Sequence, residues 1–573
     1  MRLFCLCLLV VWAAVRPAVG ADTPIITYEE RFLPTVSRGG MVVSQEKLAS
    51  EVGAEILRQG GNAVDAAVAT GFALAVTLPQ AGNLAGGGFM LVYLRDEDKT
   101  IAIDYREEAP SAAHPQIFIN DDGSVDEKRG RYSHQAVAVP GTVLGFVHAL
   151  NKYGTMTLEQ VIAPSIRLAA EGITVTYALE ASLASREAFL KRNPEAAKTF
   201  FKEDGSLYRK GEVFTQLDLA NTLRQIALGG ERVFYTGPLA QKIVAEMERN
   251  NGLISADDLA MYRVVEREPL VADFLGHRVI TMPPPSSGGV HLFQMLNMLE
   301  ELKIGGVPQN SAQYYHYLVE VMRQAYADRS KYLGDPDFVD VPVETLTSQE
   351  TAKQLVALIS ESKARRSQDV APTRLLPKES YDTTHFSVID DAGNIVSNTY
   401  TLNFSYGSGI VVEGTGMLLN NQMDDFSAAP GVPNGYGLIG SEANQIEPGK
   451  RPLSSMTPVI VQLKDGSMLA TGSPGGSTII TVVLQTVLNV LQHEMNISAA
   501  TNAPRIHHQW LPDEVLVENG ISPDTVELLE KMGHHVMYRG RTLGSTQSIR
   551  LSQGFFYGAS DPRRPGAAVA GVD

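Results

Sequence analysis

Cysteine is almost absent from the 573-residue chain, and its two copies, Cys5 and Cys7, both lie near the start. They fall in a segment with a charged beginning at Arg2, an apolar run over 3–15 and small residues at 18–20. This is the pattern of a secretory signal peptide, here residues 1–20. We therefore expect a mature chain without cysteine, which excludes disulfides, thiol catalysis and cysteine-based metal sites.

Long apolar runs and positive charge are scarce as well. After residue 20 no apolar run is long enough to span a bilayer, and the formal net charge is −16. This balance disfavours nucleic acid and anionic membranes as partners. The chain also lacks G-x-S-x-G and H-E-x-x-H, which argues against a serine hydrolase elbow and a zinc peptidase. We expect an exported protein, periplasmic or secreted, with no membrane span.

A β-hairpin pattern surrounds Thr383. Residues 383–389 and 395–402 are rich in β-branched and aromatic types, and Asp391–Asn394 supplies a turn between them. Pairing across such a short loop brings Thr401 or Leu402 opposite Thr383. The sequence therefore predicts that Thr383 has a threonine or leucine as its cross-strand neighbour.

The segment before Thr383, residues 360–382, is polar and rich in Lys, Arg, Glu, Ser and Pro. Its abrupt junction with a strand suggests that the bond between Asp382 and Thr383 is cut. A threonine hydroxyl needs an adjacent base to act as a nucleophile. A new N-terminal threonine carries one, an α-amine with a pKa of about 7.7–8.0 in model peptides. Taken alone, Thr383 is more often an ordinary strand residue, because strands favour threonine.

Two charged segments offer groups for a site. Arg106 follows a predicted strand, where it could form a surface ion pair or a fork for a substrate carboxylate. Asn420–Phe426 gathers amides around the carboxylates of Asp424 and Asp425. Such a pair could hold Mg²⁺ or Ca²⁺, but binding of a substrate ammonium is the better use for one of them.

Two glycine-rich turns are also candidates. Gly86–Gly88 precedes a strand without the G-x-G-x-x-G order, which favours close backbone packing over phosphate binding. Gly472–Ser477 joins the strand predicted at 468–471 to an apolar helix over 478–491. Its glycines could point N–H groups at an oxyanion, or merely permit a tight turn.

The remaining pattern mixes helices and strands, an α/β (α+β) class. Ser44 is expected to cap a first helix that ends at Gly60-Gly61, and Asn62 to start a buried helix over 63–77. Four further helices are expected to cover a sheet, over 158–171, 177–192, 218–227 and 238–249.

Several runs resemble a known family when taken together and in order. They are Thr383–Val388, Thr399–Asn403, Asn420–Ser427, Arg451–Met456 and Gly472–Ser477. The chain resembles the bacterial γ-glutamyltransferases, or glutathione hydrolases, over essentially its whole mature length. The resemblance implies an N-terminal-nucleophile hydrolase fold, a four-layer αββα sandwich. It also implies a proenzyme that cuts itself into a large subunit, 21–382, and a small subunit, 383–573, which stay together as a heterodimer.

The resemblance also implies a role for each site residue. The catalytic residues would be Thr383 as nucleophile, Thr401 as its hydrogen-bond partner, and Gly475 and Gly476 as the oxyanion hole. The residues binding the substrate's α-carboxylate would be Arg106, Ser454 and Ser455, and those around its α-amino group Asn403, Gln422 and Asp425. The stretch around Tyr436 resembles a lid loop.

The implied reaction is ping-pong transfer of a γ-glutamyl group, without cofactor or metal. Thr383 would take the group from glutathione or related amides and pass it to water or to an amino acid or peptide acceptor. One alternative is a glutaryl-type acylase of the same fold, such as a cephalosporin acylase, which has no need for an acid at position 425. Another is an uncleaved exported protein that only binds γ-glutamyl peptides.

Overall fold

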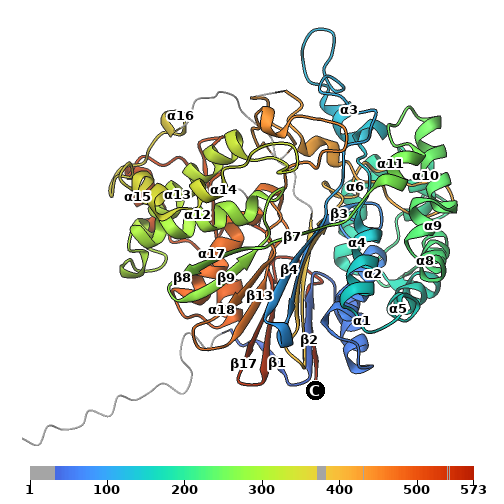
Figure 1. Ribbon diagram of the computed structural model, residues 1–573, viewed down its shortest axis with the longest axis horizontal. Coiled ribbons are helices and arrows are strands. Elements are labelled where there is room, and N and C mark those ends of the chain that lie inside the picture. The colour runs from blue at the N-terminus through green and yellow to red at the C-terminus, as the bar shows by residue number, and fades with distance from the viewer. Residues whose placement is uncertain (1–31, 371–382, 430, 436, 539, 541) are drawn as a thin grey trace, which may run out of the picture.

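Two stacked sheets form the centre of the molecule. The computed structural model describes residues 32–370 and 383–573, except 430, 436, 539 and 541. The predicted signal peptide, Asp382 and Tyr436 lie outside this part of the chain. The sheets are antiparallel with seven strands each, and helices cover the outer face of both (Figure 1). The predicted four-layer αββα sandwich of the N-terminal-nucleophile hydrolases is confirmed.

Within each sheet, the strands lie side by side in an order that differs from their order in the chain. The first sheet contains β1 (Thr35–Ser37), β18 (Phe555–Ser560), β17 (Gln547–Ser552), β13 (Met468–Thr471), β12 (Val459–Gln462), β9 (His277–Thr281) and β8 (Leu270–Phe274). The second contains β19 (Ala568–Val572), β2 (Gly40–Ser44), β10 (Thr384–Asp390), β11 (Ile395–Thr401), β3 (Gly87–Leu94), β4 (Lys99–Tyr105) and β7 (Val265–Arg267). Two small sheets contain β14 (Ile506–His507), β15 (Val515–Val517) and β16 (Val536–Tyr538), and β5 (Ile173–Thr174) and β6 (Val213–Phe214).

The helices divide between the two outer layers (Figure 1). On the side of the second sheet are α1 (Lys47–Arg58), α2 (Ala63–Thr77), α4 (Thr142–Tyr153), α5 (Leu158–Glu171), α6 (Tyr177–Leu190), α7 (Pro194–Phe200), α8 (Leu217–Gly229), α9 (Glu231–Tyr235), α10 (Pro238–Arg249) and α11 (Ala256–Met261), with α3 (Glu127–Tyr132) at one end. On the side of the first are α12 (Ser287–Glu301), α13 (Ala312–Tyr332), α14 (Val343–Leu346), α15 (Gln349–Val356), α16 (Ser367–Val370), α17 (Ile479–Leu491), α18 (Ile497–Asn502) and α19 (Pro523–Lys531). Among the described residues, no helix has the length and apolar character needed to cross a membrane.

Five strands of the second sheet, β2, β10, β11, β3 and β4, contribute side chains to two cores, because successive residues point to opposite faces. Val42 and Met90 pack under the helices of the second-sheet side. Met41 and Phe89 face the other sheet and share a core with Ile280. Burial on both faces explains why these strands lack polar alternation.

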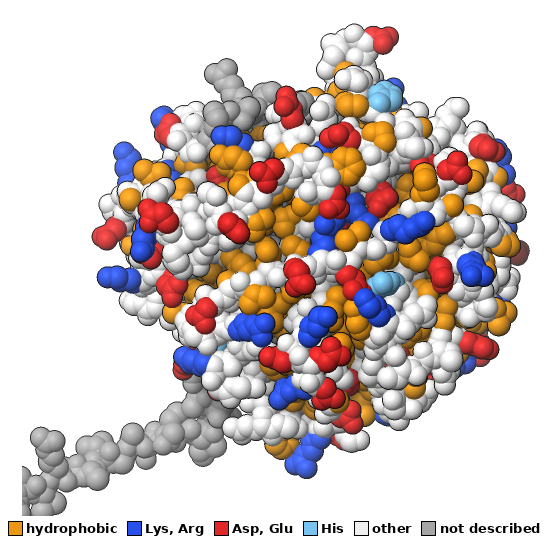
Figure 2. Space-filling model, in the orientation of Figure 1, with side chains coloured by type: hydrophobic (Ala, Val, Ile, Leu, Met, Phe, Trp, Pro, Cys, Tyr) orange, Lys and Arg blue, Asp and Glu red, His pale blue; other side chains and the backbone are white. Residues whose placement is uncertain are grey.

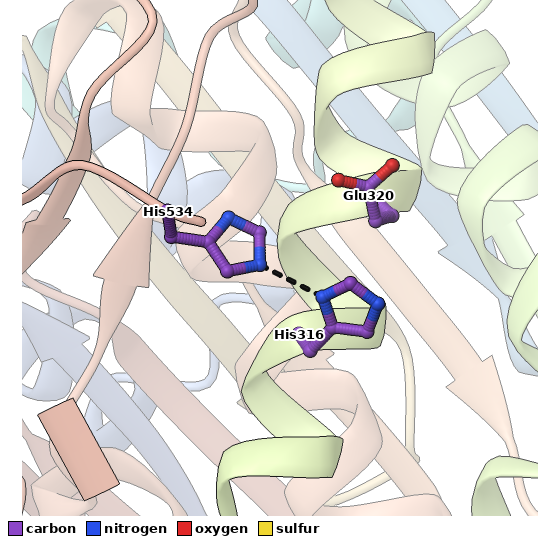
Figure 3. A group of neighbouring side chains, drawn as sticks. All are labelled: His316, Glu320 and His534. Carbon is purple, nitrogen blue, oxygen red and sulfur yellow. Dashed lines mark hydrogen bonds between the residues drawn. The ribbon is translucent and has the colours of Figure 1, made fainter. Parts of the chain in front are cut away.

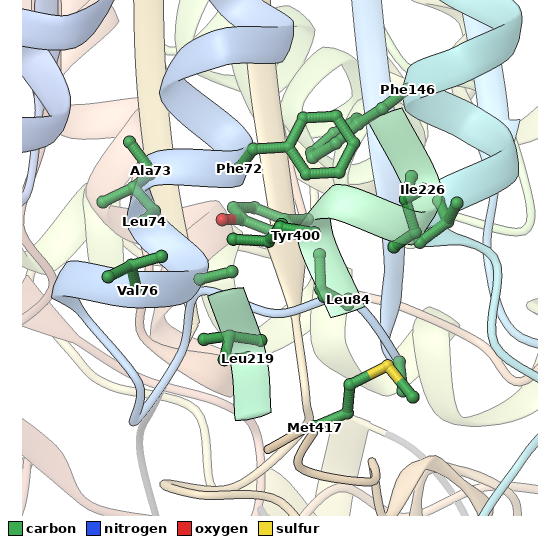
Figure 4. Close-up of a cluster of buried hydrophobic side chains, with 14 of the residues drawn as sticks. Phe72, Ala73, Leu74, Val76, Leu84, Phe146, Leu219, Ile226, Tyr400 and Met417 are labelled. Atoms are coloured by element: carbon green, nitrogen blue, oxygen red, sulfur yellow. The ribbon is translucent and has the colours of Figure 1, made fainter. Parts of the chain in front are cut away.

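The helix-covered core is built around aromatic rings (Figure 4). Phe146 of α4 lies between Phe72 of α2 and Tyr400 of β11, with ring centroids 5.4 and 5.5 Å away. The Tyr400 hydroxyl donates a hydrogen bond to the Gly71 carbonyl at 2.9 Å. The helical layer is therefore fixed directly to the strand that ends at Thr401.

The start of α1 differs from the prediction. Ser44 is not its cap, because Ser44 still pairs with Phe386 and Ala568 in the sheet. Glu46 takes that role, and its carboxylate accepts a hydrogen bond from the Ala49 N–H at 3.1 Å. Asn62 caps α2 as predicted, and α2 is buried along its whole length.

Gly71 allows close packing in this layer, and its replacement should be costly. A Cβ there would lie 2.4 Å from the ring of Phe146. Gly71→Ala is expected to lower the free energy of unfolding by about 1–3 kcal/mol despite the better helix propensity of alanine. Denaturant unfolding measures this. Gly306→Ala is the control, since a Cβ there meets no atom within 4 Å. Equal unfolding midpoints for the two variants would contradict the packing argument.

Candidate active site

The predicted hairpin is formed by β10 and β11. Thr384 pairs with Tyr400, and this register sets Thr383 opposite Thr401. The Oγ1 atoms of Thr383 and Thr401 lie 3.3 Å apart, within hydrogen-bond distance. Both residues are almost fully buried, with 5% and 3% of their surface exposed. The predicted threonine pair is confirmed, with Thr401 rather than Leu402 as the neighbour.

The glycine run Gly86–Gly88 packs closely against the end of β11 that carries Thr401. A Cβ on Gly86 would lie 2.0 Å from the carbonyl oxygen of Thr401. Gly88 is paired with Tyr400 across β3 and β11. Close backbone packing is therefore the use of these glycines, as predicted.

A narrow cavity brings most of the predicted site residues together. Its volume is about 20 Å³, room for about one water molecule, so a larger ligand needs its walls to move apart. The predicted residues that line it are Arg106, Thr383, Thr401, Asn403, Gln422, Asp425, Ser454, Ser455 and Gly476. Gly475 does not line it, although it lies in the same turn as Gly476. The lining residues that the sequence did not reveal are Arg329, Leu438, Leu453, Met456 and Ile479.

Arg106 is a fully buried cation, not the surface ion pair that its sequence position also allowed. Its guanidinium contacts Glu107 at 3.2 Å and Asp425 at 2.5 Å. Its Nε donates a hydrogen bond to the Pro452 carbonyl at 3.1 Å. Burial raises the pKa of Glu107 to about 7. Arg106 and Asp425 carry the two charges expected to bind the substrate, and in this structure these charges neutralise each other.

Hydrogen-bond acceptors gather on the Asp425 side of the cavity. Gln422 donates through Nε2 to Asp425 at 2.6 Å. The Oε1 atom of Gln422 is buried and accepts no hydrogen bond from any described residue. Asn403 has a left-handed backbone (φ 78°), and its N–H donates to Thr401 Oγ1 at 2.9 Å. A ligand ammonium placed here would meet a carboxylate and an amide oxygen near the threonine pair.

The two neighbouring carboxylates serve different purposes. Asp424 turns away from the cavity and forms an ion pair with Arg131 at 2.9 Å, while Asp425 pairs with Arg106. Burial raises the pKa of Asp424 to about 6. Because each carboxylate is bound to its own guanidinium, the pair offers no shared position for the Mg²⁺ or Ca²⁺ considered from the sequence.

Arg329 of α13 forms hydrogen bonds on the side of the cavity that contains Ser454 and Ser455. Its Nη2 donates to Ser455 Oγ at 3.3 Å, and its Nε donates to Ser287 Oγ at 2.9 Å. The Ser287 hydroxyl in turn donates to the carbonyl of Ser454 at 2.7 Å. A signal for Arg329 was present in the sequence: it continues the buried stripe of Met322 and Tyr326 at helical spacing, where an arginine is unexpected.

The turn containing Gly475 and Gly476 lies between β13 and α17. Both glycines have positive φ, 136° and 53°, which other residues rarely adopt. The Gly475 carbonyl is occupied by the N–H and hydroxyl of Thr478, at 3.0 and 2.9 Å. No hydrogen bond joins the N–H of either glycine to another described residue. The turn therefore presents free donors at the N-terminal end of a helix, as an oxyanion hole requires.

Thr383 also borders a second, larger cavity of about 290 Å³. Polar groups of Glu46, Gln80, Ser405 and Arg564 line it. Burial raises the pKa of Glu46 to about 7. Thr383 thus stands between a small charged cavity and a roomier polar one.

A histidine pair elsewhere in the fold has the composition of a metal site (Figure 3). His316 Nδ1 and His534 Nε2 are 2.8 Å apart, and Glu320 lies one helical turn from His316. However, the Glu320 carboxylate is 2.6 Å from Arg365 Nε and 3.4 Å from Arg323 Nε. Two guanidinium groups on the only anionic ligand oppose a bound cation. The cluster instead fastens the segment around Arg365 to α13.

Comparisons with known proteins agree with this site. The family model described as gamma-glutamyltranspeptidase matches residues 49–571. An Escherichia coli protein named glutathione hydrolase proenzyme is 50% identical over 97% of this chain and 96% of its own. A Pseudomonas protein named acylase ACY 1 proenzyme is 37% identical over 94% of each chain.

Solved structures give the same picture. A cephalosporin acylase from Bacillus halodurans superimposes with a TM-score of 0.82 at 28% identity, over 97% of this chain and all of that one. The gamma-glutamyltranspeptidase of Helicobacter pylori gives a TM-score of 0.58 at 41% identity, over 59% of this chain and 96% of that one. With the threonine pair and the charged cavity beside it, these matches show that the chain is an enzyme belonging to the gamma-glutamyltranspeptidase family.

Proposed function

We propose that this enzyme cuts its own chain between Asp382 and Thr383 and then transfers γ-glutamyl groups through Thr383. The observation that carries the proposal is the Thr383–Thr401 pair, 3.3 Å apart at the wall of a cavity holding Arg106 and Asp425. Several relatives are named proenzymes, which supports maturation by cleavage.

The two products of the cut, 21–382 and 383–573, would stay together as a heterodimer. β10 and β11 belong to the second product, and they lie between β2 and β3 of the first in one continuous sheet. β12 pairs with β9 in the same way in the other sheet. Separation would break both ladders and expose both cores, so covalent continuity is not needed to hold the fold.

The chemistry follows from the groups around Thr383. Once freed, its α-amine accepts the Oγ1 proton while the oxygen attacks the γ-carbonyl carbon of the substrate. The N–H groups of Gly475 and Gly476 stabilise the developing oxyanion. The C–N bond then breaks, the departing amine takes the proton, and a γ-glutamyl ester remains on Thr383. Water or an acceptor amine attacks this ester, with the same α-amine moving the proton in reverse.

Recognition of the γ-glutamyl head group is a matter of matched charges. Its α-ammonium is expected beside Asp425, Gln422 and Asn403, and its α-carboxylate beside Arg106, Ser454 and Ser455. The Arg106–Asp425 pair must open to admit the zwitterion. Because the ligand brings one charge for each partner, neither Arg106 nor Asp425 is left uncompensated in the complex.

Comparison of two anilide substrates tests the substrate class. The acylase relatives keep a glutaryl-type acylase as the second candidate. Glutaryl lacks the α-ammonium, and Asp425 favours a substrate that has one. We expect a higher kcat/KM with γ-glutamyl-p-nitroanilide than with glutaryl-p-nitroanilide. Faster cleavage of the glutaryl compound would overturn the assignment.

Thr401→Val tests the role of the second threonine. Valine keeps the shape but removes the hydroxyl beside Thr383 and the acceptor used by the Asn403 N–H. We expect kcat to fall by about tenfold with little change in KM, because such hydrogen bonds contribute roughly 0.5–1.5 kcal/mol each. Steady-state kinetics on the anilide measure this, and an unchanged kcat would remove Thr401 from the mechanism.

The proposal also covers the acceptors, the natural donor and export. Acceptors are expected to be water, amino acids or dipeptides, and glutathione the natural donor. Export to the periplasm or the medium remains a prediction from the sequence.

A further inference from the structure

The segment that leads to the proposed cut is held at one residue, Ser367. Its N–H donates a hydrogen bond to Asp513 Oδ2 at 2.8 Å, and its carbonyl accepts one from the indole N–H of Trp510 at 2.8 Å. Its hydroxyl accepts a hydrogen bond from Arg323 Nη1 at 2.6 Å. Ser367 is fully buried. All three of its polar groups are therefore bound, on the chain that runs on to Thr383.

The groups that hold Ser367 come from both sides of the proposed cut. Arg323 belongs to α13 in the first product, whereas Trp510 and Asp513 lie between β14 and β15 in the second. We call these three side chains the cradle. Arg323 also forms an ion pair with Asp513. The cradle therefore joins the two products independently of the bond that is cut.

Both carboxylate oxygens of Asp513 accept hydrogen bonds. Oδ2 accepts from the Ser367 N–H, and Oδ1 accepts from Arg323 and from His508 Nε2, the latter at 3.2 Å. Burial lowers the pKa of His508 to about 3, so its ring is neutral. Its Nδ1 accepts from the Trp510 N–H at 3.1 Å, which leaves the proton on Nε2. An amide at position 513 would not satisfy these donors, because it has only one acceptor oxygen.

Trp510 has a backbone conformation that bulky residues rarely adopt. It is left-handed, with φ 68°, and only 2% of the residue's surface is exposed. Such conformations cost free energy and persist where the surroundings enforce them, often at functional positions. This supports a role for the indole contact with Ser367 beyond packing.

We propose that the cradle positions the chain for self-cleavage, with Trp510 and Asp513 as positioning residues. This inference rests on the proposed cut between Asp382 and Thr383. The cradle holds the start of α16, residues 367–370, and the β10–β11 hairpin holds Thr383. With both ends of the intervening stretch fixed, the Thr383 hydroxyl meets the carbonyl carbon of Asp382 more often.

The bond changes themselves involve only Asp382, Thr383 and water. Thr383 Oγ1 attacks the Asp382 carbonyl carbon, the C–N bond breaks, and the hydroxyl proton passes to the Thr383 nitrogen. The resulting ester between Asp382 and Oγ1 is hydrolysed by water, which leaves a carboxyl group on Asp382 and restores the hydroxyl. The cradle touches none of these atoms, so it acts only on how the chain is presented.

The competing explanation is that the cradle only stabilises the folded enzyme. That role predicts that loss of the cradle lowers kcat per cut molecule together with the rate of cutting. A positioning role predicts slower cutting with unchanged kcat in the molecules already cut. Arg366→Gln is the matched control, because Arg366 adjoins Ser367 but forms an exposed ion pair with Asp369 of the same segment.

The experiment follows the full-length chain on a gel after a pulse of labelled cell-free synthesis, which gives a first-order rate constant for cutting. Turnover of γ-glutamyl-p-nitroanilide per cut molecule gives kcat. The main variant is Arg365→Gln/Asp513→Asn, because Arg365 also holds the segment, through Glu320 at 2.6 Å.

Release of the segment moves the last held residue before Thr383 from Val370 back to Val356, at the end of α15. This about doubles the intervening stretch, which lowers the effective concentration of the reacting groups about threefold. We therefore expect the double variant to slow cutting at least about threefold, with kcat per cut molecule within about twofold. Arg366→Gln should leave both quantities within about twofold.

Trp510→Phe covers the case in which the double variant does not fold. It removes only the indole hydrogen bond to Ser367, and such a bond is equivalent to about two- to tenfold in an equilibrium, so cutting should slow at least about twofold. An unchanged rate in both cradle variants, an equal fall in Arg366→Gln, or a matching fall in kcat per cut molecule would overturn the inference. An unsubstituted chain that is not cut before Thr383 would instead overturn the proposed function.

Discussion

Thr383→Ala is expected to give a full-length chain that neither cuts itself nor turns over γ-glutamyl amides. The substitution removes the oxygen proposed to attack both the Asp382–Thr383 bond and the substrate. Loss of a catalytic nucleophile costs on the order of 10⁴- to 10⁶-fold in kcat. Gel electrophoresis and turnover of γ-glutamyl-p-nitroanilide measure the two effects on the same preparation.

A neighbouring threonine provides the control for this variant. Thr384 is fully buried, and its hydroxyl makes no hydrogen bond with any described residue. Thr384→Val should therefore mature and keep its activity within a few-fold, since no polar partner is lost. Cleavage of the Thr383→Ala chain at the same bond would show that another group attacks it.

Asp425→Asn should produce the second-largest loss. The carboxylate is the anion predicted to receive the α-ammonium, and it also balances Arg106 at 2.5 Å. Truncating one member of a buried charge pair costs about 2–5 kcal/mol, or roughly 30- to 5000-fold in kcat/KM. Glutaryl-p-nitroanilide, which has no ammonium, should be affected much less.

Asp424→Asn separates this electrostatic effect from a general disturbance of the loop. Asp424 is the neighbouring residue and also carries a carboxylate, but it forms an ion pair with Arg131 and does not line the cavity. We expect a much smaller loss of kcat/KM for this variant than for Asp425→Asn, because Asp424 does not line the cavity that receives the substrate. Equal losses for the two substitutions would remove Asp425 from ammonium recognition.

Local sequence pattern was sufficient to predict the hairpin. Strand composition on both sides of a four-residue turn left Thr401 or Leu402 as the neighbour of Thr383, and the register in the structure selects Thr401. The helices predicted over 158–171 and 238–249 have these bounds in the structure. Such features depend on residues close in sequence.

Features that depend on distant residues were not predictable in the same way. Arg106 and Asp425 are 319 positions apart, and no periodicity indicates that they pair. Arg329 joins the cavity because α13 packs beside the serine loop, a tertiary contact. The prediction that Ser44 caps α1 is wrong because strand pairing with β10 and β19 outweighs a local capping preference.

The most direct test of the account is the N-terminal sequence of the smaller fragment in the purified enzyme. The account predicts that this fragment begins Thr-Thr-His-Phe-Ser, at Thr383, and that enzyme with this cut turns over γ-glutamyl amides. A fragment that starts at another residue, or full turnover by an intact chain, would contradict the claim that the bond before Thr383 must break to release the nucleophile's own base.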